Sequence, residues 1–207
     1  FGVLPLIIML AVIGGILLKQ PDTKSFILIV VTGFSMLFIS GVPWKSVFLL
    51  SFSAVAVLSV LVFFTPYLQQ RVKTFIDPSQ DPQGSSYQIQ QSLIAIGGGG
   101  IFGRGYGQSI QKFSFLPEPQ GDSIFAIIGE ELGFVGAVGT IILYILFILR
   151  GLRIAKNSPD LFSRLLVSGI VILIGAQSFM HIASVVGVFP LTGVPLVFIS
   201  HGGTSLM

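Results

Sequence analysis

Long apolar runs are the feature of this sequence that most restricts the folds open to it. Hydrophobic residues make up 53% of the 207 residues and charged residues only 9%, whereas roughly 25% of the residues of a soluble globular domain are charged. A helix needs about 20 mainly apolar residues to cross a bilayer. We therefore predict an all-α, polytopic transmembrane protein, with spans at residues 1–18, 26–41, 46–65, 123–149 and 165–188 and a last span that starts near 200–207.

The polarity of the chain is concentrated in residues 66–122, a Gly- and Pro-rich segment between two of these spans. Loops of this length are uncommon unless they are functional. Within it, Ile89, Leu93 and Ile96 recur at helical spacing, which predicts a short amphipathic helix on the membrane surface. Residues 189–205 break the helical pattern with Pro and Gly, and we expect them to fold toward this loop.

Charge predicts the sidedness of the loops. Loop 150–164 contains four basic side chains and one acidic side chain, namely Arg150, Arg153, Lys156, Arg164 and Asp160. Because short cytoplasmic loops are rich in Arg and Lys, we expect this loop to be cytoplasmic and loop 66–122 to be extracytoplasmic. The basic residues form no stripe with interleaved aromatic residues, so we expect membrane lipid, and no nucleic acid, among the partners.

Asp122 is the first candidate for chemistry, because it stands where the polar loop meets the apolar segment that begins at Ser123. One interpretation is structural: an aspartate before a helix accepts hydrogen bonds from backbone N–H groups and caps the helix. The other is chemical, since a carboxylate kept ionised at a helix N-terminus can accept a proton from a substrate hydroxyl. The two are compatible, and the sequence alone favours the cap.

Glu130 and Glu131 are further acidic candidates, because both lie within an apolar span. At 100° per residue, a helix places Glu130 about 80° and Glu131 about 180° around from Asp122. The two glutamates therefore do not both share its face. Ionisable groups inside a membrane are either functional or paired with a polar group of a neighbouring helix, and both interpretations stay open.

Basic residues near a glycine cluster suggest an anion site. Arg104 and Lys112 stand beside glycines that permit tight turns, and they could hold an anionic head group or simply contact lipid phosphates. The glycine pattern does not complete a nucleotide-binding loop. His181 and His201 are too isolated for metal-ligand spacing, so we assign them no chemistry.

Several motifs, in order along the chain, closely resemble those of the SEDS family, the shape, elongation, division and sporulation proteins of bacteria, with FtsW and RodA among them. These motifs are Gln20-Pro-Asp22, Phe75-Ile-Asp-Pro78, Gly103-Arg-Gly-Tyr-Gly107, Leu116-Pro-Glu118, Glu130-Glu-Leu-Gly133 and Gly187-Val-Phe-Pro-Leu-Thr-Gly-Val-Pro195. The sequence between Gly107 and Glu118 is more similar to that of the division branch, FtsW, than to that of the elongation branch.

This resemblance implies a SEDS fold of ten spans, of which the chain would be the later fragment. It implies a peptidoglycan glycosyltransferase that polymerises lipid II into glycan strands at the bacterial cytoplasmic membrane during cell division, with undecaprenyl pyrophosphate as the leaving group. The family's catalytic aspartate falls on Asp122, which would act as general base. The implied partners are a class B penicillin-binding protein transpeptidase and other divisome proteins.

Pyrophosphate carries concentrated negative charge, so basic residues, or a divalent cation such as Mg²⁺ or Mn²⁺, would stabilise it. The substrate-binding candidates are Arg71, Lys73, Gln91, Arg104, Lys112, Glu118 and Ser200. Three alternatives remain open. They are an elongation-type polymerase like RodA, a lipid-linked precursor transporter with Glu130, Glu131 and His181 along its path, and a scaffold that recruits a transpeptidase through Gly169 and Gly175.

Overall fold

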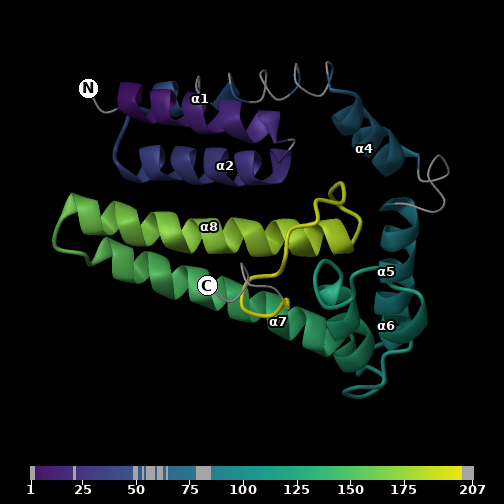
Figure 1. Cartoon of the computed structure of the whole chain (residues 1–207). Helices are drawn as coiled ribbons and strands as arrows, with labels where there is room; N and C mark the ends of the chain where they lie inside the picture. The colour runs from purple at the N-terminus through teal and green to yellow at the C-terminus, as the bar shows by residue number, and fades with distance from the viewer. Residues whose placement is uncertain are drawn as a thin grey trace. The chain divides into compact units, whose positions relative to one another are not determined.

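The computed structural model describes residues 3–20, 22–48, 51, 52, 54, 59, 63, 65–77 and 85–201. The regular structure of these residues is helical, as predicted, and Figure 1 shows the individual helices. The chain divides into two compact units. One comprises residues 1–61 and 146–176, and the other comprises residues 62–145 and 177–207. The helices are α1 (Val3–Lys19), α2 (Thr23–Ile39), α4 (Pro66–Ile76), α5 (Ser85–Gly99), α6 (Gln111–Ser114), α7 (Ile124–Lys156) and α8 (Leu161–Val185).

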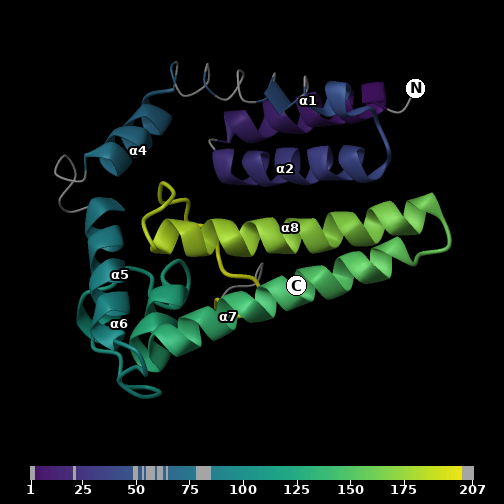
Figure 2. The same cartoon turned by 180° about the vertical axis from the view of Figure 1, so that it is seen from behind.

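In the first unit, α1 and α2 lie antiparallel and side by side (Figures 1 and 2). Gly14 permits this contact, because a Cβ atom there would lie 2.5 Å from the Phe26 ring. Asp22 starts α2 by accepting hydrogen bonds from the amide of Ser25 at 3.3 Å and from its hydroxyl at 2.7 Å. Such a cap satisfies a backbone N–H that the helix itself leaves unpaired.

The turn between α7 and α8 is much shorter than the predicted loop 150–164. α7 continues to Lys156 and α8 already begins at Leu161. α8 starts early because Asp160 caps it, accepting the amide and the hydroxyl of Ser163 at 2.8 Å each. The hydrogen bond from the Ser163 amide, and then the one from the Ser163 hydroxyl, hold the pKa of the Asp160 carboxyl below its usual value.

Two of the described helices, α7 and α8, are long and apolar enough to cross a membrane, judged by length and composition. The helices found at the predicted spans 1–18 and 26–41 are α1 and α2, which are apolar over shorter stretches. Most of the span predicted at 46–65, and residues 202–207 of the last predicted span, lie outside the described residues.

In the second unit, the polar segment 66–122 is largely helical where it is described. A helix is present where one was expected around Ile89, namely α5, whereas α4 and α6 were not predicted. Its placement on the membrane surface stays a prediction. α5 packs closely on the start of α7, since a Cβ at Gly99 would lie 2.0 Å from the Gly129 carbonyl oxygen. The core of this unit includes Phe125 and Leu196, which are 2% and 0% exposed.

Candidate active site

Asp122 lies in the turn immediately before α7, and the prediction that it caps this helix is wrong. α7 begins at Ile124, and the Ser123 carbonyl accepts the amides of Ala126 at 3.0 Å and Ile127 at 3.4 Å. Ser123 therefore occupies the cap position. Across the described parts of the chain, no backbone N–H donates to the Asp122 carboxylate, which is partly exposed. The carboxylate is thus not used by the fold.

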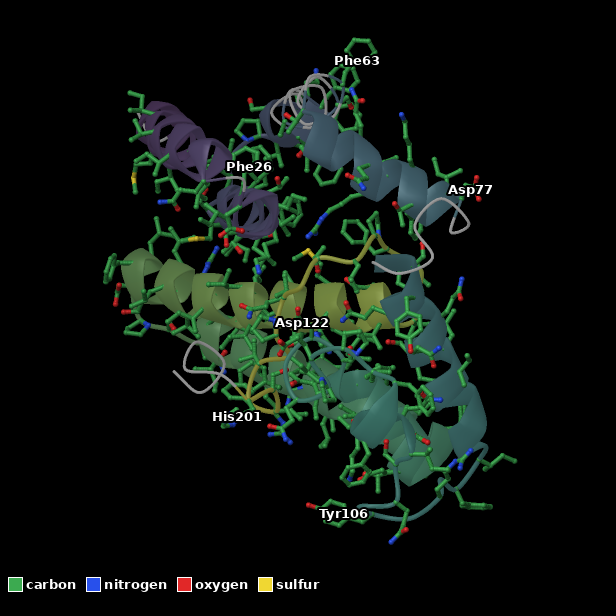
Figure 3. The ribbon with its side chains drawn as sticks, turned by 45° about the vertical axis from the view of Figure 1, so that its right-hand side comes forward. Phe26, Phe63, Asp77, Tyr106, Asp122 and His201 are labelled. Carbon is green, nitrogen blue, oxygen red and sulfur yellow. The ribbon has the colours of Figure 1, made fainter. Side chains whose placement is uncertain are left out.

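The turn that carries Asp122 is nevertheless rigidly held. The Asp122 amide donates to the Glu118 carbonyl at 3.2 Å. The Ser123 hydroxyl donates to the Pro117 carbonyl at 3.2 Å and accepts a bond from Gln88 Nε2 on α5 at 3.0 Å. Figure 3 shows Asp122 among the packed elements, whereas Tyr106 lies at their outer edge. The backbone of the turn is fixed while the carboxylate stays available.

The C-terminal segment 190–201 folds onto this turn, as predicted. The Ser200 hydroxyl donates to the Gly121 carbonyl at 2.8 Å and accepts the Leu196 amide at 2.8 Å. The His201 amide donates to the Gln120 carbonyl at 2.8 Å. Ser200, a predicted substrate ligand, is 1% exposed. Its hydroxyl positions Gly121, the residue before Asp122.

One face of α8 holds the C-terminal segment through three side chains. The three contacts are Gln177 Nε2 to the Pro195 carbonyl at 3.3 Å, His181 Nδ1 to the Val194 carbonyl at 2.6 Å and Ser184 Oγ to Thr192 Oγ1 at 3.1 Å. This polar face of α8 was not predicted. Its signal was the spacing of positions 177, 181 and 184, which places three polar side chains on one side of an apolar helix.

Glu130 and Glu131 bind the glycine-rich loop 103–112. Glu130, which is 1% exposed, accepts the Ser109 hydroxyl at 2.6 Å and the Ile110 amide at 3.1 Å. Glu131 accepts the Gly107 amide at 2.9 Å and Lys112 Nζ at 2.6 Å. The polar partners of both glutamates therefore come from segment 103–112, whose last two residues begin α6.

Arg104 and Lys112, two predicted anion ligands, each pair with one of these glutamates. Arg104 Nε lies 3.5 Å from Glu130 Oε1, and Lys112 Nζ lies 2.6 Å from Glu131 Oε1. The Arg104 side chain remains 41% exposed. It can therefore still reach an anion in solution or in a lipid head group.

A break in α7 at Gly133 positions segment 103–112 against the helix. Gly133 has φ 69° and ψ −166°, so the helix loses its regular hydrogen bonds there. The freed Glu130 and Glu131 carbonyls accept the amides of Arg104 and Gly105, each at 3.0 Å. The Phe134 amide in turn donates to the Gly100 carbonyl, just after the end of α5, at 2.9 Å.

Replacing Glu130 by alanine should open this loop. The Ser109 hydroxyl and the Ile110 amide would lose their acceptor, at about 1–3 kcal/mol for each donor left buried. Amide hydrogen exchange in the full-length protein should show lost protection at residues 109–111. The control Arg104→Met breaks the same ion pair from its exposed side, which should cost only about 0–1 kcal/mol. Equal protection in both variants would contradict this account.

The remaining candidates lie on other elements of the same unit. Arg71 on α4 donates to the Leu191 carbonyl at 2.6 Å, so it holds the C-terminal segment. The side chains of Lys73, Gln91 and Glu118 form no hydrogen bond or ion pair with another described residue. No group of three or more His, Asp or Glu side chains able to hold a metal ion occurs in the described parts of the chain.

The fold and the site define the class of this protein: a helical protein with helices apolar enough to cross a membrane and a carboxylate held, unbonded, before one of them. The model of the cell cycle protein family of FtsW, RodA and SpoVE matches residues 1–207. The chain belongs to this family, which confirms the resemblance seen in its motifs.

Relatives and solved structures agree with this assignment. Stage V sporulation protein E of Bacillus subtilis is 42% identical over 92% of this chain and 52% of its own length. The probable peptidoglycan glycosyltransferase FtsW of Neisseria gonorrhoeae is 44% identical over 100% of this chain and 46% of its own. The chain thus spans about half the length of the curated relatives that it matches.

Two solved structures share the fold. A chain from a peptidoglycan synthase complex that coordinates polymerization and crosslinking has a TM-score of 0.79 and is 30% identical, over 97% of this chain and 56% of that one. A mutant of the rod shape determining protein RodA of Thermus thermophilus has a TM-score of 0.62 and is 26% identical, over 97% of this chain and 50% of that one.

Proposed function

We propose that the protein containing this chain is a peptidoglycan glycosyltransferase that polymerises lipid II into glycan strands during bacterial cell division. Asp122 is the general base. It takes the proton of the GlcNAc 4-hydroxyl of one lipid-linked disaccharide while that oxygen attacks the anomeric carbon of the other chain. The bond from that carbon to the pyrophosphate breaks, and undecaprenyl pyrophosphate leaves.

The observation that carries this proposal is the state of the Asp122 carboxylate. It is partly exposed, and no described residue donates a hydrogen bond to it. It sits on a turn that is held by backbone and side-chain hydrogen bonds within the turn and to α5 and the C-terminal segment. A carboxylate that serves only the fold would be used as a cap or in an ion pair. A general base must instead be open to the hydroxyl that it deprotonates.

Basic groups for the leaving pyrophosphate come from loop 103–112 and from α4. The pairing of Arg104 and Lys112 with the two glutamates fixes where these cations lie, and a fixed cation stabilises a developing anion better than a mobile one. Lys73 is exposed on α4. A divalent cation stays a proposal, since Mg²⁺ is commonly held by one or two carboxylates together with substrate phosphates.

The membrane arrangement belongs to the same proposal. We propose a multi-pass domain in the bacterial cytoplasmic membrane, with segment 66–122 on the extracytoplasmic side and the α7–α8 turn in the cytoplasm. The positive charge near this turn supports the second assignment. Arg150, Arg153 and Lys156 are all exposed on the last turns of α7.

The relatives support the choice of reaction and of partner. Several relatives bear the name FtsW, as does the one from Neisseria gonorrhoeae, which favours the division branch over an elongation-type polymerase. The fold match to a chain of a peptidoglycan synthase complex supports a class B penicillin-binding protein as partner; other divisome proteins are proposed with it. A transporter path through Glu130 and Glu131 is less well supported, because both carboxylates bind loop 103–112.

The test uses the full-length protein and its transpeptidase partner in vesicles with fluorescent lipid II. We expect muramidase-sensitive glycan strands and released undecaprenyl pyrophosphate. Movement of intact lipid II across the bilayer without any polymer would contradict the proposal and favour the transporter. Parallel vesicles with the partner alone show whether the polymer comes from this protein.

A further inference from the structure

His181 on α8 is buried, and its protonation state follows from one contact. The side chain is 1% exposed, and Nδ1 lies 2.6 Å from the Val194 carbonyl oxygen. A carbonyl oxygen can only accept a hydrogen bond, so Nδ1 carries the proton. In the neutral ring the other nitrogen, Nε2, is then an acceptor.

This acceptor has no partner. Nε2 of His181 is buried, and no described residue forms a hydrogen bond with it. Buried polar atoms are nearly always hydrogen-bonded, and an exception points to a missing ligand, water or function. The contact with the Val194 carbonyl accounts for the hydrogen bond of Nδ1 only. The role of His181 in holding the C-terminal segment therefore does not explain why Nε2 is buried without a partner.

Asp122 is the group that completes this arrangement. Both residues meet the same C-terminal segment: His181 contacts the Val194 carbonyl, and the turn that carries Asp122 is bonded to Ser200 and His201. An electrostatic interaction between the two side chains agrees with this placement. The other titratable or charged groups on the elements around His181 are occupied elsewhere or exposed: the Tyr144 hydroxyl on α7 donates to the Val197 carbonyl, Arg71 on α4 donates to the Leu191 carbonyl, and His201 is exposed. An ionised carboxylate cannot donate to Nε2, whereas a protonated one can.

We propose that His181 is a positioning residue for Asp122. The protonated carboxyl group of Asp122 donates a hydrogen bond through one water to His181 Nε2. The inference rests on the proposed function. In the reaction the substrate O–H bond breaks, the proton moves to an Asp122 oxygen, and the new carboxyl O–H bonds to Nε2 through this water without transferring the proton further. A hydrogen bond made only by the protonated form favours transfer of the proton from the substrate hydroxyl to Asp122.

A spectroscopic experiment tests the contact without any need for activity. In the full-length protein with ¹⁵N-labelled histidine, the His181 Nε2 resonance is identified as the signal that His181→Asn removes. We expect Asp122→Asn to shift this resonance and to change its response to pH, and Asp160→Asn to leave both unchanged. A His181 signal that responds to neither variant would overturn the inference, whatever the protein catalyses.

Kinetics test the consequence for the base. His181→Leu should lower the polymerisation rate roughly tenfold, the worth of about one hydrogen bond, and should move the acidic limb of the pH–rate profile to lower pH. His181→Asn retains a donor for the Val194 carbonyl and an acceptor for Asp122, so it should restore most of the rate and the profile. A lower rate with an unmoved profile in both variants would reduce His181 to a structural role. Absence of polymerisation in the wild type would instead reject the proposed function.

Discussion

Alanine at Gly103 is expected to detach loop 103–112 from α7. A Cβ at this position would lie 2.1 Å from the Glu131 carbonyl oxygen and 2.5 Å from its carbon, so backbone must move. Gly103 also has φ 80°, where a side chain costs about 1–2 kcal/mol. With the overpacking added, we expect a total of roughly 2–5 kcal/mol.

Gly107 offers a matched control within the same loop. Its φ is 79°, but a Cβ there would meet no atom within 4 Å. Gly107→Ala thus carries only the backbone strain. Trypsin cleavage after Arg104 in the full-length protein measures the open population of the loop. Gly103→Ala should be cut roughly 5- to 150-fold faster than Gly107→Ala, and equal rates would contradict the role of the close contact.

The helical fold could be predicted from the sequence because hydrophobic runs and their punctuation are local signals. α1, α2, α7 and α8 lie where apolar runs were found. The ends of α7 and α8 were misjudged, because helices continue past an apolar run when caps and charges suit them. The Asp160 cap favours an early start of α8, and the basic last turn favours a late end of α7. Both features can be recognised in the sequence.

The pairing within the candidate site could not be predicted in this way. A straight helix was expected to keep Glu130 and Glu131 from both sharing the face of Asp122, and their partners were left open. The break at Gly133 frees their backbone carbonyls, and segment 103–112 meets both side chains. Sequence periodicity carries no information on which loop returns to a helix. The cap expected at Asp122 failed because Ser123 takes that position.

Asp122→Asn is expected to lower glycan polymerisation by about 10²–10⁴-fold, the contribution typical of a general base. The amide of asparagine has nearly the shape of the carboxylate but cannot accept the proton. The fold should not suffer, because the described residues donate no hydrogen bond to the carboxylate and the turn is held by Ser123, Ser200 and the backbone. Asp160→Asn, which changes an exposed carboxylate at the start of α8, is the matched control.

The measurement that tests the central claim most directly is therefore the single-turnover rate of strand formation from lipid II by the full-length protein with its transpeptidase partner. It compares wild type, Asp122→Asn and Asp160→Asn at equal folded fraction and equal substrate binding. The account predicts strands from wild type and Asp160→Asn and almost none from Asp122→Asn. Equal rates in all three would show that Asp122 is not the base and would remove the assignment of the active site.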